Sequence, residues 1–116
     1  MLDLIAKHAR FIESFHVLLY EREGDSFRFR AEVTFKNKSK VFIKEYVFEN
    51  LERKYAYHWT DASENLICRW DNSNHWPDIS TFPHHKHIGS EIFESTQTNF
   101  GDVLDSIIKE IEDNTG

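Results

Sequence analysis

Apolar and polar residues alternate strictly along residues 27–35, FRFRAEVTF, so that every second side chain is hydrophobic. A period of two is typical of an antiparallel strand with one buried face. Comparable runs predict strands over residues 17–22, 41–49, 54–60 and 66–70. Residues 41–49 carry large apolar side chains on both faces, which indicates a central strand covered on both sides. The pattern therefore predicts an antiparallel sheet of about five strands.

Two segments with helical periodicity flank this sheet. Apolar residues recur at helical spacing over residues 2–14, which predicts an N-terminal helix. Over residues 100–111 they form a complete amphipathic stripe, which predicts a C-terminal helix packed on the sheet, with Thr98 or Asn99 as its N-cap. A long irregular segment rich in histidine is expected from residue 71 to about residue 88, with a short strand near its end. The expected fold class is α+β.

The composition is that of one small globular domain. The 116 residues, 40% of them hydrophobic, are expected to form a single domain whose last residues, 113–116, fray. Cys68 is the one cysteine, which fits a reducing compartment, and its place in an apolar alternation indicates a core thiol. The first residues mix charged with apolar side chains, unlike a signal peptide, and no apolar run reaches membrane-spanning length. We expect a soluble, cytoplasmic protein.

The formal charge of −6 has the wrong sign for a non-specific nucleic-acid binder. Charge is unevenly spread, however. Between residues 69 and 89, Arg69 and Lys86 balance Asp71 and Asp78, and four histidines add positive charge when protonated. A second set of basic residues lies earlier in the chain: Arg28, Arg30, Lys36, Lys38 and Lys40. We expect these side chains to lie on a solvated strand face and turn, although such a patch could bind phosphates or an acidic partner.

Residues 57–89 hold both prolines, all three tryptophans and five of the seven histidines. Clustered imidazoles suggest proton transfer, metal binding or phosphate contact, because their pKa lies near physiological pH. In an extended segment His85 and His87 point one way, while His84 and Lys86 point the other. RNA cleavage through the 2′-hydroxyl needs a base, an acid and a cation, and two histidines with Lys86 or Arg69 could supply them.

Two other interpretations remain open. Three imidazoles with a carboxylate could hold a metal ion, the candidates being His75, His84, His85 and His87 with Asp71 or Asp78. The histidines could also be structural, in a solvated loop that bonds backbone and water. His58 lies opposite the aromatic face of its strand and is expected on the solvent side.

The segment YAYHWTDASENLICRWDNSNHWPDISTFPHHKHIG, followed by NFGDVLDSIIKEI, resembles the TumE family of small bacterial and archaeal toxins. The similarity covers residues 15–112, with residues 69–72 and 82–87 as its specific parts, and Trp76 departs from the smaller or polar residue common there. The resemblance implies a toxin that is neutralised by a helix-turn-helix antitoxin encoded beside it, the partner named TumA in the founding pair. Toxins of this size often act on RNA, so the resemblance makes a ribonuclease plausible.

The shared motifs and the required chemistry together nominate one set of catalytic candidates, with no cofactor and no metal: Tyr57, Asp61, Arg69, Asp71, His75, His84, His85, Lys86 and His87. The first hypothesis is a metal-independent endoribonuclease toxin with RNA as substrate. The alternatives are a non-enzymatic interaction module of a toxin–antitoxin operon and a histidine-ligated, metal-dependent nuclease. A homodimer is left open.

Overall fold

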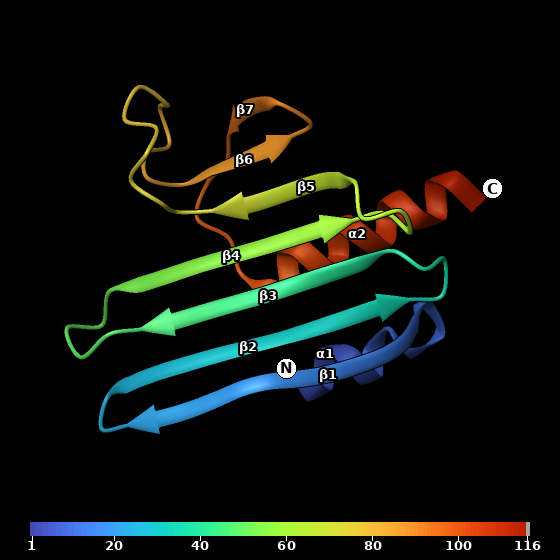
Figure 1. Ribbon diagram of the computed structural model, residues 1–116, viewed down its shortest axis with the longest axis horizontal. Helices are drawn as coiled ribbons and strands as arrows, with labels where there is room; N and C mark the ends of the chain where they lie inside the picture. Colours follow the sequence, from blue (N-terminus) through green and yellow to red (C-terminus); the bar gives the residue numbers. More distant parts are fainter. Residues whose placement is uncertain (116) are drawn as a thin grey trace.

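The computed structural model describes residues 1–115 (Figure 1). Within them, seven antiparallel strands form one sheet in which each strand pairs with the next along the chain. The strands are β1 (Ile12–Glu23), β2 (Ser26–Phe35), β3 (Lys40–Val47), β4 (Arg53–Thr60), β5 (Leu66–Asp71), β6 (His85–Ile88) and β7 (Glu91–Glu94). The expected α+β class with an antiparallel sheet is confirmed.

Both helices, α1 (Leu2–Lys7) and α2 (Phe100–Thr115), lie on the same side of the sheet (Figure 1). Asn99, one of the two predicted N-caps, accepts a hydrogen bond at Oδ1 from the backbone N–H of Asp102, 2.9 Å away. The apolar stripe of α2 packs on alternate residues of β2 to β5 and forms the core with them: Phe29, Ala31, Val33, Phe35, Val41, Ile43, Tyr55, Tyr57, Trp59, Cys68, Phe100, Val103, Leu104, Ile107, Ile108 and Ile111.

The number of strands and the length of the first helix differ from the predictions. β6 and β7 raise the count from about five to seven; they lie late in the chain, where an irregular segment with a short strand was expected. The helix predicted over residues 2–14 ends at Lys7, and a 3₁₀ turn (Ala9–Phe11) leads directly into β1. The reason is tertiary, because β1 pairs with β2 from Ile12 to Glu23 and these backbone bonds outweigh a local helical pattern.

The prediction that β3 is covered on both sides is also wrong. Val41 and Ile43 are buried on the side of α2, whereas Phe42 on the other side is exposed. No helix within residues 1–115 covers that second side (Figure 1). On this side the ring of Tyr46 is covered by a charged side chain, since Lys44 lies over it.

We call this side, which no described helix covers, the open face. It is formed by alternate residues of β2 to β6, which the strand register aligns in rows: Arg28, Arg30, Glu32, Phe42, Lys44, Tyr46, Lys54, Ala56, His58, Arg69, Asp71, His85 and His87.

α2 continues to Thr115, the last described residue, and Gly116 lies outside the described part of the chain. No helix within residues 1–115 combines the length and apolar character needed to cross a membrane.

Candidate active site

One arginine stands between two histidines on the open face. His58 of β4 pairs directly with Arg69 of β5, which pairs in turn with His87 of β6. Directly paired residues of neighbouring strands share a face of the sheet, so the three side chains stand in one row. Nη1 of Arg69 lies 3.4 Å from Nδ1 of His58. Because the guanidinium can only donate, it favours a His58 ring without a proton on Nδ1.

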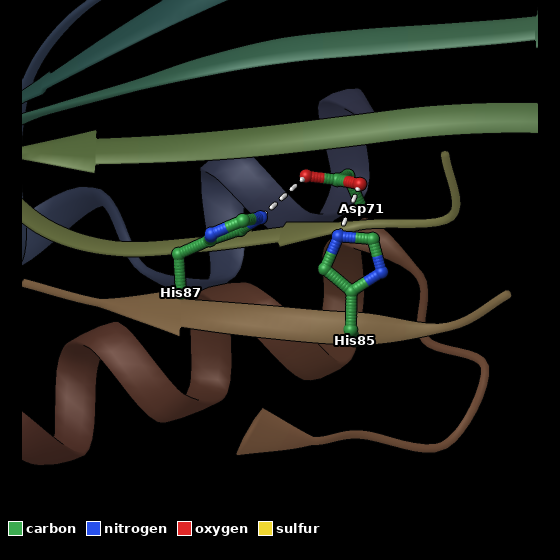
Figure 2. Close-up of side chains that lie close together, drawn as sticks. All are labelled: Asp71, His85 and His87. Carbon is green, nitrogen blue, oxygen red and sulfur yellow. Dashed lines mark ion pairs between the residues drawn. The ribbon is translucent and has the colours of Figure 1, made fainter. Parts of the chain in front are cut away.

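The carboxylate of Asp71 lies in the neighbouring row, where β5 pairs with Ala56 of β4. It is buried, and Oδ1 accepts hydrogen bonds from the backbone N–H and the hydroxyl of Ser73, at 3.0 and 2.9 Å. Oδ2 accepts a hydrogen bond of 3.0 Å from Nε of Arg69 and lies 3.4 Å from Nε2 of His87 (Figure 2). Asp71 therefore orients both Arg69 and His87.

Hydrogen bonding keeps Asp71 ionised. Burial alone would raise the pKa of its carboxyl, but the bonds from Ser73 and Arg69 outweigh burial and hold the pKa below its ordinary value. A buried negative charge thus lies beside the row of His58, Arg69 and His87, next to the positive charge of the arginine.

His85 supports the same carboxylate from inside the protein. Its side chain is 1% exposed and lies beside Asp71, with Nε2 2.8 Å from Oδ1 (Figure 2). Nδ1 lies 2.8 Å from the carbonyl oxygen of Pro83, to which it donates. Although Nε2 is so close to Asp71, it makes no hydrogen bond with any described residue. A ring this deeply buried cannot reach a substrate.

The surroundings of His58 and His87 lower the pKa of both imidazoles. Burial lowers the pKa of His58, and the charge of Arg69 lowers it further. Burial also lowers the pKa of His87, but there the carboxylate of Asp71 opposes the shift. The electrostatic surroundings of the two rings therefore differ, since Asp71 favours the protonated form of His87 and Arg69 disfavours that of His58.

A hollow of about 220 Å³ lies beside this row, over the small side chain of Ala56. Arg30, Lys44 and Arg69 are among the residues that line it. Burial, followed by the charges of nearby cations with Lys54 foremost, lowers the pKa of the Lys44 amine. Three cations around a small floor make a site for an anion such as a phosphate group.

Three of the predicted candidates lie on the helix side of the sheet. Nδ1 of His84 is 2.8 Å from the hydroxyl of Tyr55 in the core. Tyr57 is fully buried, where its hydroxyl bonds to Glu45 and accepts from Arg53. Lys86 pairs with Trp70 and lines a hollow beside α2. These side chains are separated from the open face by the sheet itself.

Two more candidates lie in the connections between strands. Oδ1 of Asp61 accepts from the backbone N–H groups of Ser63 and Asn65, at 2.8 and 2.9 Å, and so shapes the turn between β4 and β5. His75 is exposed in the loop between β5 and β6. Of the predicted set, the structure brings together Arg69, Asp71, His85 and His87 only.

His58 belongs to the site but was not among the catalytic candidates. It was expected only to lie on the solvent side of its strand. Its position in the alternation of β4 already indicated the polar face. What the sequence lacked was the register of β4 on β5, which sets His58 opposite Arg69.

Fold and site together define a small α+β protein whose helices cover one side of the sheet and whose other side carries a histidine–arginine–aspartate cluster. The chain belongs to the TumE toxin family, because the sequence profile described as Toxin TumE matches residues 1–115. The resemblance seen in the sequence is thereby confirmed. Membership points to the toxin of a toxin–antitoxin module and implies an antitoxin partner. No curated protein and no solved structure matches the chain.

Proposed function

We propose that this toxin is a metal-independent endoribonuclease in which His58 and His87 act as base and acid on either side of Arg69. The observation that carries the proposal is the row of these three side chains beside a hollow lined by cations. Neighbouring strands lie about 4.8 Å apart, so the backbones of the two histidines are separated by roughly 10 Å, with the arginine between them. A phosphate bound at Arg69 would have one imidazole on each side.

The chemistry follows from the surroundings of each ring. His58 takes the proton of the 2′-hydroxyl on its unprotonated Nδ1, once Arg69, whose Nη1 lies 3.4 Å from Nδ1, bonds to the phosphate instead. The 2′-oxygen then attacks phosphorus, and the bond to the 5′-oxygen breaks. His87 in its protonated form gives its proton to that leaving oxygen, and Asp71 favours this charged form against the burial that lowers the pKa of the ring. The products are a 2′,3′-cyclic phosphate and a 5′-hydroxyl, and Arg69 stabilises the charge on the phosphorane.

This assignment differs from the sequence-based hypothesis in the choice of histidines. His85 serves to hold Asp71 because it is buried, and His84 lies on the helix side. Lys44 and Arg30 take the place proposed for Lys86 as additional cations near the phosphate.

The test is incubation of the purified, untagged protein with RNA in the presence of a chelator, followed by analysis of the RNA ends. We expect cyclic phosphate ends. His58→Ala and His87→Ala should each lower kcat by roughly 10²–10⁴-fold, the usual contribution of a general acid or base. His16→Ala is the matched control, since His16 is exposed on β1. Cleavage at the wild-type rate by both site variants would refute the proposal.

A metal-dependent nuclease is the second candidate, and one observation favours it. The ligand atoms of Asp71, His85 and His87 lie within 4.8 Å of one another. His85 donates from Nδ1 to a backbone carbonyl, as metal-bound imidazoles commonly do. Against it, Arg69 already bonds to Oδ2 of the same carboxylate. Stoichiometric metal in the untagged protein, with activity lost to a chelator, would establish this second candidate.

We also propose a helix-turn-helix antitoxin, encoded by the adjacent gene, as the partner. The support is the resemblance of residues 15–112 to the toxins of such pairs. Induction of the toxin gene should stop growth, and co-expression of the neighbouring gene should restore it and yield a complex on purification. Growth arrest without RNA cleavage, but with capture of a defined protein, would instead support the non-enzymatic alternative.

A further inference from the structure

An exposed aromatic ring stands at each end of the row of His58, Arg69 and His87. Phe42 of β3 pairs directly with His58, with ring centroids 6.3 Å apart, and it is 39% exposed. Trp76, in the loop between β5 and β6, lies edge-on to His87 at 6.2 Å and is 40% exposed. Each histidine to which the proposed function gives a catalytic role thus touches one aromatic side chain that is open to solvent.

The surroundings of these rings point to a ligand that is both charged and planar. Phe42 also lines the cationic hollow with Lys44 and Arg30. A purely apolar partner would leave these cations without a counter-charge. A ligand with an anionic group between two flat apolar groups would place the anion at the cations and the flat groups on the two aromatic rings. A nucleic-acid strand has this pattern, with a phosphate between successive bases.

The strand must be unpaired to use both rings. In a duplex the bases are stacked inside the helix, so an aromatic side chain on an open sheet cannot reach their flat surfaces. An unpaired base can turn outward and stack on Phe42 or Trp76, and every base has such a surface. Recognition of this kind tolerates many sequences, because stacking distinguishes single strands from duplexes but makes no contact with the base edges.

We infer that the substrate is a single-stranded RNA whose bases on either side of the cleaved phosphate stack on Phe42 and Trp76. This inference rests on the proposed nuclease function and adds the class of substrate to it. The phosphate lies on Arg69, one base lies beyond His58, and the other lies beyond His87.

Binding can be separated from chemistry with a 2′-O-methyl oligonucleotide, which has no free 2′-hydroxyl and cannot be cleaved by this route. We would measure its affinity by fluorescence anisotropy. Phe42→Ala and Trp76→Ala should each weaken binding by about 5- to 150-fold, the range expected for loss of one stacked base. With cleavable RNA the same variants should raise KM and leave kcat within about threefold.

Three further variants guard against general damage to the fold. Trp76→Phe keeps a planar ring and should restore most of the affinity. Phe42→Leu keeps apolar volume without a planar ring, and it should bind as weakly as the alanine variant. Tyr20→Ala is the matched control, since Tyr20 is 61% exposed but pairs with Phe29 of the helix side. It should bind normally.

Equal affinity of the Phe42 and Trp76 variants and the wild type would overturn the inference. So would a duplex of the same sequence that binds as tightly with the same dependence on both rings. Loss of antitoxin binding alone, with oligonucleotide binding unchanged, would reassign this face to a protein partner. If the analogue binds through both rings but RNA is never cleaved, the stacking site is supported and the nuclease activity alone is refuted.

Discussion

Replacement of Asp71 by asparagine should destabilise the protein substantially, although the two side chains have nearly the same shape. Asparagine keeps one oxygen, which can continue to accept both bonds from Ser73. The second oxygen becomes an amide group, whose hydrogens meet the Nε–H of Arg69 and the ring of His87. Donors then face donors inside a buried pocket, and the guanidinium loses its counter-charge.

The magnitude follows from these contacts. A hydrogen bond to a charged group contributes about 1.5–3 kcal/mol, and removal of one partner from a buried ion pair costs about 3–5 kcal/mol. The side chain of Arg69 is 40% exposed, so water can partly replace the lost carboxylate and reduce the cost. We therefore expect the free energy of unfolding to fall by about 2–3 kcal/mol at pH 7, or roughly 10 °C in Tm.

The pH dependence gives a second, independent signature. The folded-state pKa of the Asp71 carboxyl lies below its unfolded value, so the stabilisation is complete above the unfolded pKa of about 3.9. It is lost as the pH falls through the folded pKa, where the wild-type carboxylate takes up a proton. The difference between wild type and Asp71→Asn should therefore be full at pH 7 and should shrink at pH values below about 3.9.

Urea unfolding followed by tryptophan fluorescence measures both effects. Asp78→Asn is the matched control, because Asp78 is exposed in the same loop and its replacement should change the free energy of unfolding by less than about 0.5 kcal/mol. A loss at pH 7 no larger than that of the control would refute our account of the buried carboxylate. So would a loss that stays constant down to pH 3.

Two further predictions concern the open face, and a third concerns Tyr57 in the core. Because the pKa values of both His58 and His87 are lowered, kcat/KM for RNA should show a bell-shaped pH profile whose maximum lies below pH 6.5. Activity that rises from pH 6 to pH 8 would contradict the acid–base assignment. Lys44→Gln should reduce the slope of log Kd against log salt for a single strand by about 0.7, whereas an unchanged slope would remove Lys44 from the phosphate site. Tyr57→Phe should lower the free energy of unfolding by about 1–3 kcal/mol and leave kcat unchanged, and a loss of kcat in a stable protein would restore Tyr57 to the active site.

Much of the fold was predictable because its main signals are local. The alternation of residues 27–35 identifies a half-buried strand, and the apolar stripe of residues 100–111 identifies the helix that covers it. Both depend only on the direction in which successive side chains point. The short strands β6 and β7 carry no such alternation. They exist because backbone groups pair across the sheet, as in the pairing of His85 with Asp71.

For the candidate site, too, some features followed from the sequence and others only from the tertiary structure. The sequence alone determined which chemical groups are present and that His85 and His87 share a face of an extended segment. Only the tertiary structure decided that His58 stands beside Arg69 and that His85 is buried. The physical reason is register: a shift of one residue between paired strands moves every side chain to the other face. That choice is made by hydrogen bonds and packing between segments far apart in the chain.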